Sequence, residues 1–203
     1  MKTILVVVDV QKDFYHPDGA LYVKGAEVLP SKIAEVIPHF DDVVFTVDWH
    51  PQTHCSFAYN GGDWPIHCVA FTEGASLPVE FLPFLKNLQE MVIAGFGKYD
   101  RCSNVITKGL NPTKEEYGAD ANAIMTAHDE NPEECEFVFC GVAGNYCVME
   151  TINNFITKFP NAKVSVLTEC VASIDDGSTL RNYMNEHNIP ACLITTFLHE
   201  LYK

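Results

Sequence analysis

The chain has 203 residues, 47% of them hydrophobic, and we expect a single globular domain spanning 1–203 with a sizeable core. Its 27 acidic residues against 13 basic ones give a formal net charge of −14, which argues against nucleic acid and against an anionic membrane surface as partners. The eight cysteines form no spacing typical of a disulfide scaffold, so we expect a reducing compartment, the cytoplasm.

Apolar runs rich in β-branched residues alternate along the chain with segments of helical spacing. We predict strands over 3–8, 42–47, 91–94, 136–140, 163–167 and 191–194, and helices over 28–40, 145–159 and 177–187. The strands lack strict polar alternation, which indicates burial on both faces, as in a parallel sheet. The order predicts an α/β fold with an open, doubly wound, mostly parallel sheet of five or six strands and helices on both faces. The stretch 51–114 has few regular elements, and such a stretch in a compact domain is usually functional.

Three chemically active side chains follow predicted strands. Asp9 follows the first strand, Asp48 ends the second, and Cys147 follows the strand 136–140. In open α/β sheets, ligands bind beyond the carboxyl ends of the strands, so we expect a site at this edge. Cys147 also stands at the predicted start of a helix, where the helix dipole favours a thiolate. The alternative is a buried apolar role, which we assign to the other seven cysteines.

A thiol that attacks an amide needs a base and a cation nearby. Asp9 can accept the proton of Cys147 and later give it to a leaving amine. A lysine can hold both anions in place, and chemistry alone does not choose between Lys98 and Lys108. Asp13, four residues after Asp9, is interpreted as structural, tying the loop that follows the first strand.

Asp48, His50 and His67 form a candidate metal site. Asp48 and His50 are two residues apart, so in an extended segment their side chains share a face. Two imidazoles and a carboxylate with open positions are typical of a catalytic site for zinc, iron or manganese. A structural zinc site would be closed by four protein ligands, and the nearby cysteines form no CxxC pair. His54 is a candidate fourth ligand or a partner of one of the ligands.

A series of short motifs, in their order and spacing, resembles the nicotinamidases of the isochorismatase-like cysteine hydrolase family over nearly the whole chain. The motifs are Asp9-Val10-Gln11-Lys12-Asp13-Phe14, Asp48-Trp49-His50-Pro51, His54-Cys55-Ser56-Phe57, Trp64-Pro65-Ile66-His67-Cys68, Thr107-Lys108-Gly109 with Glu116-Tyr117, and Gly141-Val142-Ala143 through Cys147-Val148. The resemblance implies that family's α/β fold and the hydrolysis of nicotinamide to nicotinate and ammonia, a step of NAD salvage. Members are often homo-oligomers, and the sequence identifies no interface.

The resemblance also assigns catalytic roles. It implies a triad of Asp9, Lys108 and Cys147, with Lys108 preferred over its alternative because the family's lysine precedes a glycine and a tyrosine-containing segment. It implies a thioester on Cys147 as the reaction intermediate. It further implies a non-proline cis peptide between Val142 and Ala143, with the N–H groups of Ala143 and Cys147 facing the developing oxyanion.

By the same resemblance, one divalent metal ion, with zinc the first choice and iron or manganese the alternatives, binds Asp48, His50 and His67. The ion would bind the pyridine nitrogen of the substrate. A further set of residues is expected to bind the substrate, the aromatic ones as walls around its flat ring: Phe14, Trp64, Tyr117 and Val142.

The chain departs from the family pattern at three places. Gly144-Asn145 replaces the usual Thr-Asp, Tyr117-Gly118-Ala119 replaces Tyr-Ser-Ala or Tyr-Ser-Gly, and the stretch 81–102 is longer than in the compact bacterial members. The first two changes are expected to touch the pocket lining and bear on the choice of substrate.

Two other classes of function compete with this interpretation. A related cysteine hydrolase acting on another small amide or carbamoyl compound is the alternative, although many such relatives lack the metal residues. A non-catalytic binding module is disfavoured, because a binder has no need of Asp9, Lys108 and Cys147 together. Isochorismate-cleaving members lack the nucleophilic cysteine, so Cys147 argues against that reaction.

Overall fold

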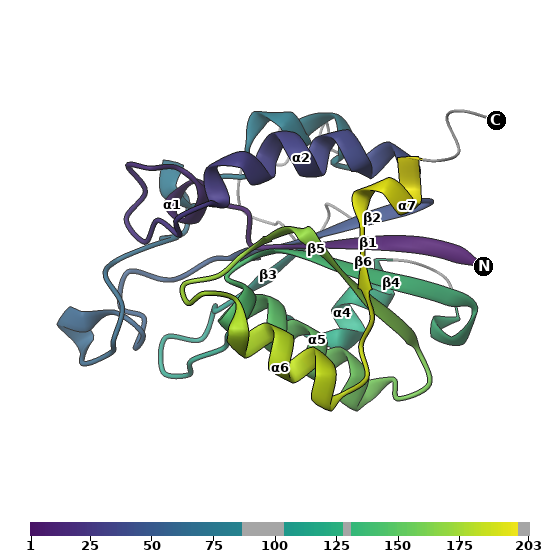
Figure 1. Ribbon diagram of the computed structural model, residues 1–203. Helices are drawn as coiled ribbons and strands as arrows, with labels where there is room; N and C mark the ends of the chain where they lie inside the picture. The colour runs from purple at the N-terminus through teal and green to yellow at the C-terminus, as the bar shows by residue number, and fades with distance from the viewer. Residues whose placement is uncertain (87–103, 128–130, 199–203) are drawn as a thin grey trace.

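The computed structural model describes residues 1–86, 104–127 and 131–198 (Figure 1). One sheet holds its six strands, which are β1 (Lys2–Val8), β2 (Asp42–Asp48), β3 (Val105–Lys108), β4 (Cys135–Val142), β5 (Lys163–Ala172) and β6 (Ala191–Cys192). Every pair of neighbouring strands is parallel. The order across the sheet is β3-β2-β1-β4-β5-β6, so the chain winds outward from β1 to β3 and then continues on the other side of β1.

Helices cover both faces of this sheet. They are α1 (Lys12–Tyr15), α2 (Leu29–Val36), α4 (Ala121–Thr126), α5 (Met149–Lys158), α6 (Ser178–Glu186) and α7 (Ile194–Leu198). Figure 1 shows α1, α2 and α7 on one face and α4, α5 and α6 on the other. Short 3₁₀ helices lie at Ala26–Val28, Ile37–His39, Ala58–Asn60, Glu73–Ala75, Val79–Phe84 and Pro132–Glu134, and a π-helical turn at Gly144–Val148 leads into α5. The predicted open, doubly wound α/β sheet is confirmed.

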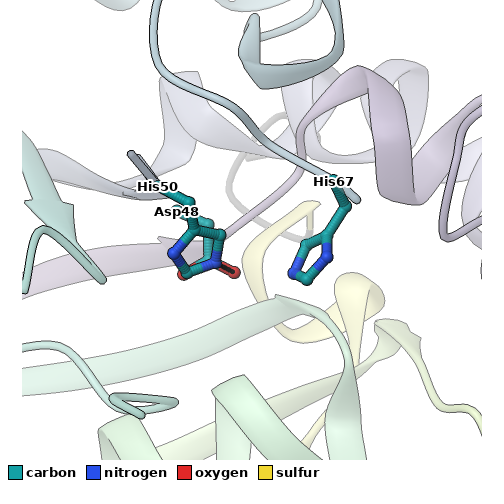
Figure 2. A group of neighbouring side chains, drawn as sticks. All are labelled: Asp48, His50 and His67. Atoms are coloured by element: carbon teal, nitrogen blue, oxygen red, sulfur yellow. Dashed lines mark ion pairs between the residues drawn. The ribbon is translucent and has the colours of Figure 1, made fainter. Parts of the chain in front are cut away.

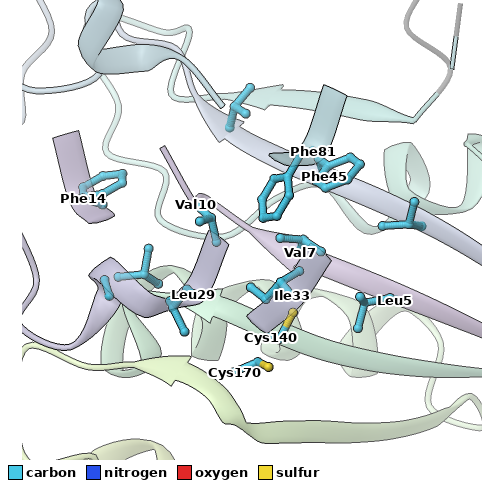
Figure 3. Close-up of a cluster of buried hydrophobic side chains, with 14 of the residues drawn as sticks. Leu5, Val7, Val10, Phe14, Leu29, Ile33, Phe45, Phe81, Cys140 and Cys170 are labelled. Carbon is cyan, nitrogen blue, oxygen red and sulfur yellow. The ribbon is translucent and has the colours of Figure 1, made fainter. Parts of the chain in front are cut away.

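Each face of the sheet has its own apolar core, because successive side chains of a strand point to opposite faces. Leu5 and Val7 of β1 belong to the core on the α2 face, together with Ile33 of α2 (Figure 3). Ile4 and Val6, which alternate with them along β1, belong to the other core with Phe155 of α5. Strands covered on both faces are apolar throughout. For this reason β1, β2 and β4 could be predicted from composition.

The structure differs from the sequence prediction at the outer strands. β3 escaped prediction because it has four residues, of which two are only half-buried. β5 continues past 167 to Ala172 through a polar segment, Thr168 and Glu169, where its register with β4 shifts. β6 ends at Cys192, and Ile194, which was expected to end that strand, begins α7. The predicted strand 91–94 lies outside the described residues.

The stretch 51–114, expected to be irregular, consists of turns, bends and 3₁₀ helices in its described part, with β3 as its one strand there. In the described ranges, no helix has the length and apolar character needed to cross a membrane.

Candidate active site

Four neighbouring strands bring polar side chains to one edge of the sheet. In sheet order, β3 ends at Lys108, β2 ends at Asp48, and Asp9 directly follows β1. Cys147 follows β4 within the π-helical turn. Because β1 and β4 are neighbours where the winding reverses, Asp9 and Cys147 flank the switch point at which open α/β sheets bind ligands. The strand ends therefore bring these groups together, as the sequence predicts.

Asp9 is fully buried and its carboxylate is fixed by β2. Its φ of 50° lies in the left-handed region, which non-glycine residues rarely adopt. Its N–H donates to the Thr46 carbonyl at 3.1 Å, and the Thr46 hydroxyl donates to Asp9 Oδ1 at 2.7 Å. Because Thr46 holds Oδ1, the other carboxylate oxygen, Oδ2, is the one that lies beside Lys108.

Lys108 lies at the centre of the cluster. Its Nζ is 2.8 Å from Asp9 Oδ2, 2.5 Å from Asp48 Oδ1 and 3.7 Å from Cys147 Sγ. The contact with Asp9 is a buried ion pair. One ammonium, itself 5% exposed, therefore balances two carboxylates beside a thiol.

These contacts set the charges of the cluster. Burial raises the pKa of Asp9, and the Lys108 ammonium opposes this rise. Burial also acts on Asp48, but there Lys108 and His50 outweigh it and the pKa of Asp48 is lowered. Burial would lower the pKa of Lys108, but the two carboxylates raise it well above its ordinary value. Asp48 and Lys108 are consequently an ionised pair.

Cys147 differs from the thiolate that the helix dipole predicts. Burial raises the pKa of its thiol well above the ordinary value, and Asp9 and Asp48 raise it further, while Lys108 opposes the rise. With the residue 6% exposed and two carboxylates nearby, burial and repulsion outweigh the effect of the Lys108 ammonium on this pKa. Cys147 is therefore a neutral thiol at rest. Oxygen atoms of Asp9 and Asp48 lie within 4.8 Å of its sulfur, so an acceptor for its proton is at hand.

The turn around Cys147 is held by backbone hydrogen bonds. The Ala143 carbonyl accepts from the N–H groups of Tyr146 and Val148, both at 3.1 Å. The peptide between Val142 and Ala143 is cis, as the resemblance implies.

The departures from the family pattern have packing causes. A Cβ at Gly144 would lie 2.2 Å from Ser173 Oγ, so a larger residue there would require the Ser173 side chain to shift. A Cβ at Gly118 would lie 2.5 Å from the backbone oxygen of Glu150 in α5, which leaves no room for serine. Asn145 accepts a hydrogen bond from a backbone N–H of the loop after β5. None of these three residues lines the cavity beside Cys147.

Asp48, His50 and His67 form a second buried group (Figure 2), in which one ligand atom of each lies within 4.8 Å of the others. His50 Nδ1 is 3.0 Å from the Gly109 carbonyl, and His67 Nδ1 is 2.8 Å from the Pro65 carbonyl. Carbonyl partners require protons on both Nδ1 atoms, so the Nε2 lone pairs are available. His50 Nε2 lies 3.7 Å from Asp48 Oδ2. This donor set fits a divalent metal ion.

His54 lies beside this group rather than within it. Its ring centroid is 4.1 Å from that of His50, and its Nδ1 is 2.7 Å from the Ser56 hydroxyl. Its buried Nε2 has no hydrogen-bond partner among the described residues. Burial lowers the pKa of His54, so the ring is neutral at neutral pH. Its predicted role as a ligand or as a partner of a ligand stays a prediction.

A cavity of about 30 Å³ adjoins Cys147, and aromatic rings form much of its wall. Phe14, Trp64 and Tyr117 line it, as the sequence predicts. Trp64 Nε1 donates to the Tyr117 hydroxyl at 3.0 Å. Tyr146, which the sequence reasoning missed, also lines the cavity and packs edge-on against Trp64 with ring centroids 5.2 Å apart. Its position directly before the candidate nucleophile was a signal that could have identified it.

The remaining wall corrects one expectation. Val142, expected to bind the substrate, is fully buried in the core on the α2 face and does not line the cavity, whereas Ala143 does. Glu115, directly before the Glu116-Tyr117 motif, and Ile174, in the loop after β5, also line the cavity. A wider groove of about 690 Å³ lies beside β5 and α6, and the described residues that line it include none of the site residues.

No family model matches the chain. A nicotinamidase from Saccharomyces cerevisiae is 29% identical to it, with 93% of this chain and 98% of the yeast protein covered. The structure of PnC1 from L. infantum in complex with nicotinate matches with a TM-score of 0.71 and 27% identity, covering 96% of this chain and 93% of that one. The pyrazinamidase of Pyrococcus horikoshii in complex with zinc matches with a TM-score of 0.70 and 28% identity, covering 95% and 99%. Over nearly its whole length the chain is therefore similar to proteins named nicotinamidase and pyrazinamidase, in agreement with the resemblance that its motifs indicate.

Proposed function

We propose that the protein is a metal-dependent nicotinamidase, which hydrolyses nicotinamide to nicotinate and ammonia through a thioester on Cys147. The observation that carries this proposal is the position of the Lys108 ammonium, in contact with Asp9, Asp48 and Cys147 at the switch point of the sheet. Asp48 belongs at the same time to the group that can hold a metal. Lys108 thus links the nucleophile and the base, and Asp48 links Lys108 to the metal group.

The first half of the reaction forms the thioester. Ionised Asp9 takes the proton of the Cys147 thiol as the sulfur attacks the carboxamide carbon, and the carbonyl oxygen becomes an oxyanion. When the C–N bond breaks, Asp9 gives that proton to the nitrogen, and ammonia leaves. Asp9 suits this task because Thr46 holds its Oδ1, while Oδ2 lies beside the Lys108 ammonium that also contacts the Cys147 sulfur.

In the second half, Asp9 takes a proton from water as the water oxygen attacks the thioester carbon. The C–S bond then breaks, and the Cys147 sulfur recovers the proton from Asp9. Lys108, 3.7 Å from the sulfur, stabilises negative charge there in both halves. The N–H groups of Ala143 and Cys147 are proposed as the donors to the oxyanion.

Asp48, His50 and His67 would hold the ion, for which we propose zinc. When bound, it supplies a Lewis acid that anchors the pyridine nitrogen of nicotinamide. The Nδ1 bonds of the two histidines support this assignment, because they orient both rings with Nε2 available. His54 Nδ1 accepts the Ser56 N–H at 3.2 Å, so the proton of its neutral ring is on Nε2, which favours a role beside the ion as a partner of a ligand over a role as a fourth ligand.

Phe14, Trp64, Tyr117 and Tyr146 are proposed to enclose the substrate ring. The cavity of about 30 Å³ is far smaller than the roughly 300 Å³ and more of usual small-molecule sites. The aromatic side chains must therefore move apart when the ring enters. We propose that the reaction serves NAD salvage, and the seven free cysteines of the described part support a reducing compartment such as the cytoplasm.

The test is ammonia release from the purified protein after addition of nicotinamide, with and without a chelator. We expect release that the chelator abolishes and that added zinc restores. Chelator-resistant release would contradict the metal dependence. Absence of release from the metal-loaded protein would contradict the substrate and move the assignment to another small amide or carbamoyl compound.

A further inference from the structure

The geometry points to the loop after β1 as a positioning frame for the metal site, in which Gln11 fixes Asp48 and Asp13 fixes the segment that carries His67. Neither Gln11 nor Asp13 belongs to the group of possible metal ligands among the described residues. Gln11 bonds to the backbone of the ligand Asp48, and Asp13 bonds to the backbone of Cys68, next to the ligand His67. This inference rests on the metal site of the proposed function.

Gln11 is fully buried and holds both sides of the Asp48 backbone. The Asp48 N–H donates to Gln11 Oε1 at 2.7 Å, and Gln11 Nε2 donates to the Asp48 carbonyl at 2.8 Å. Nε2 also donates to the Ala75 carbonyl at 2.9 Å. One side-chain amide therefore locks the last residue of β2 to the segment after His67.

Asp13 holds the other ligand segment. Its Oδ2 accepts a hydrogen bond from the Cys68 N–H at 2.7 Å, and its Oδ1 accepts from the Ala20 N–H at 3.1 Å. A Cβ at Gly74 would lie 2.1 Å from Asp13 Oδ2, so the chain passes close to this carboxylate. Asp13 therefore contacts the loop that carries His67. This agrees with the interpretation of Asp13 as a structural residue and identifies the segment that it holds.

His67 depends on such a tie because it lies in neither a helix nor a strand. Figure 2 shows its ring facing Asp48 and His50 from a separate segment. The next residue, Cys68, has a φ of 45°, in the left-handed region that non-glycine residues rarely adopt. Two bonds hold this residue: its N–H donates to Asp13, and its carbonyl accepts from the His50 N–H at 3.0 Å.

The frame therefore joins two segments that are far apart in the sequence. Without it, all three ligands remain in the chain, but fewer contacts fix the distances between their ligand atoms: the backbone bonds between His50 and the segment after His67 remain. Groups that only orient metal ligands typically contribute about tenfold to hundredfold to metal affinity. We expect losses of that size when the frame is broken.

The experiment compares metal affinity in Gln11→Met and Asp13→Asn with matched controls at the opposite end of the sheet. Asn104 is the control for Gln11: it is also fully buried, and its side-chain amide also makes three bonds to backbone groups, those of Val43, Phe84 and Lys86. Asp41→Asn is the control for Asp13, because Asp41 likewise accepts a backbone N–H, that of Thr3, at 2.7 Å.

Zinc affinity is measured by competition with a chromophoric chelator, and the absorption spectrum of the Co²⁺-loaded protein reports ligand geometry. We expect Gln11→Met and Asp13→Asn to bind zinc about tenfold or more weakly and to change the Co²⁺ spectrum. Asn104→Leu and Asp41→Asn should lower the unfolding temperature but leave affinity and spectrum as in the wild type. Equal losses of affinity in frame and control variants, or no loss in either, would overturn the frame.

The affinity comparison does not depend on nicotinamide. A wild-type protein that binds zinc at this site but releases no ammonia would overturn the proposed reaction and not the frame. A wild-type protein without affinity for divalent ions would overturn the frame together with the metal site.

Discussion

Lys108 and Asp48 face each other at the ends of neighbouring strands, with Nζ 2.5 Å from Oδ1. Their pairing follows from the sheet, since the two residues are register partners in β2 and β3. The other carboxylate oxygen of Asp48 faces His50 Nε2 at 3.7 Å. Asp48 thereby belongs to both the charged cluster around Cys147 and the metal group. A change of charge or position in one group therefore alters the contacts of Asp48 in the other.

Replacement of Lys108 by methionine should destabilise the protein and stop turnover. The variant leaves two buried carboxylates without their cation, and breaking a buried ion pair on one side costs about 3–5 kcal/mol. Unfolding in urea measures the loss. Lys114→Met is the control, because Lys114 pairs with Glu116 at the surface and its loss should change stability little. Equal stability of the two variants would contradict the central role of Lys108.

The register of β3 also explains what the sequence could and could not predict. Continuous apolar runs identified β1, β2 and β4, and the residues at their ends identified the edge that holds Asp9, Asp48 and Cys147. β3 is too short and too little buried to be read in this way. The choice of Lys108 over Lys98 therefore came from the family pattern, and Lys98 lies outside the described residues.

Other parts of the site depend on tertiary contacts that no local pattern records. The raised pKa of the Cys147 thiol arises from burial and from carboxylates of two other segments, whereas the sequence indicates only the nearby helix terminus. The bonds from Gln11 to the Asp48 backbone likewise appear only once β1 and β2 lie side by side. Conversely, Phe14 and Trp64, which the family resemblance assigns to the substrate pocket, do line the cavity.

The activity should fall on the acid side as Asp9 becomes protonated. Only the ionised carboxylate can accept the thiol proton, and burial raises the pKa of Asp9 above the ordinary value of about 4. Activity is therefore present above the raised pKa and is lost as the pH falls through it. The measurement is kcat/KM for nicotinamide against pH with saturating metal. An acid limb at or below the ordinary value would contradict this role, and Asp9→Asn should have no such limb because it has no base.

Removal of one histidine ligand should abolish stoichiometric metal binding. We expect His50→Ala and His67→Ala to lose more affinity than the about tenfold to hundredfold expected of groups that only orient a ligand. Burial lowers the pKa of His67, so its ring stays neutral and able to bind metal until the pH falls through that lowered value. Metal content after dialysis is the measurement. His187→Ala, at an exposed position of the chain, should keep the wild-type content.

Replacement of Trp64 by alanine should raise KM with little change in kcat. The variant removes one wall of the cavity and its bond to Tyr117, and aromatic pairs contribute about 0.5–1.5 kcal/mol beyond buried area, which corresponds to roughly 2- to 12-fold in affinity. Steady-state kinetics with nicotinamide measure the change. Tyr59→Ala is the control, because Tyr59 is 58% exposed and does not line the cavity. An unchanged KM in Trp64→Ala would show that the substrate does not contact this ring.

Replacement of Cys147 by alanine should abolish turnover while metal content stays at the wild-type level. The thiol forms the bond to the substrate carbon, but it does not belong to the group formed by Asp48, His50 and His67. Ammonia release and metal analysis on the same preparation test both halves of this statement. Cys55→Ala, which removes a thiol outside the cavity, should leave both unchanged. Mass spectrometry after rapid acid quench should detect the thioester adduct on the wild-type protein and none on Cys147→Ala. Substantial activity in Cys147→Ala would rule out covalent catalysis and leave water activated by Asp9 as the attacking group.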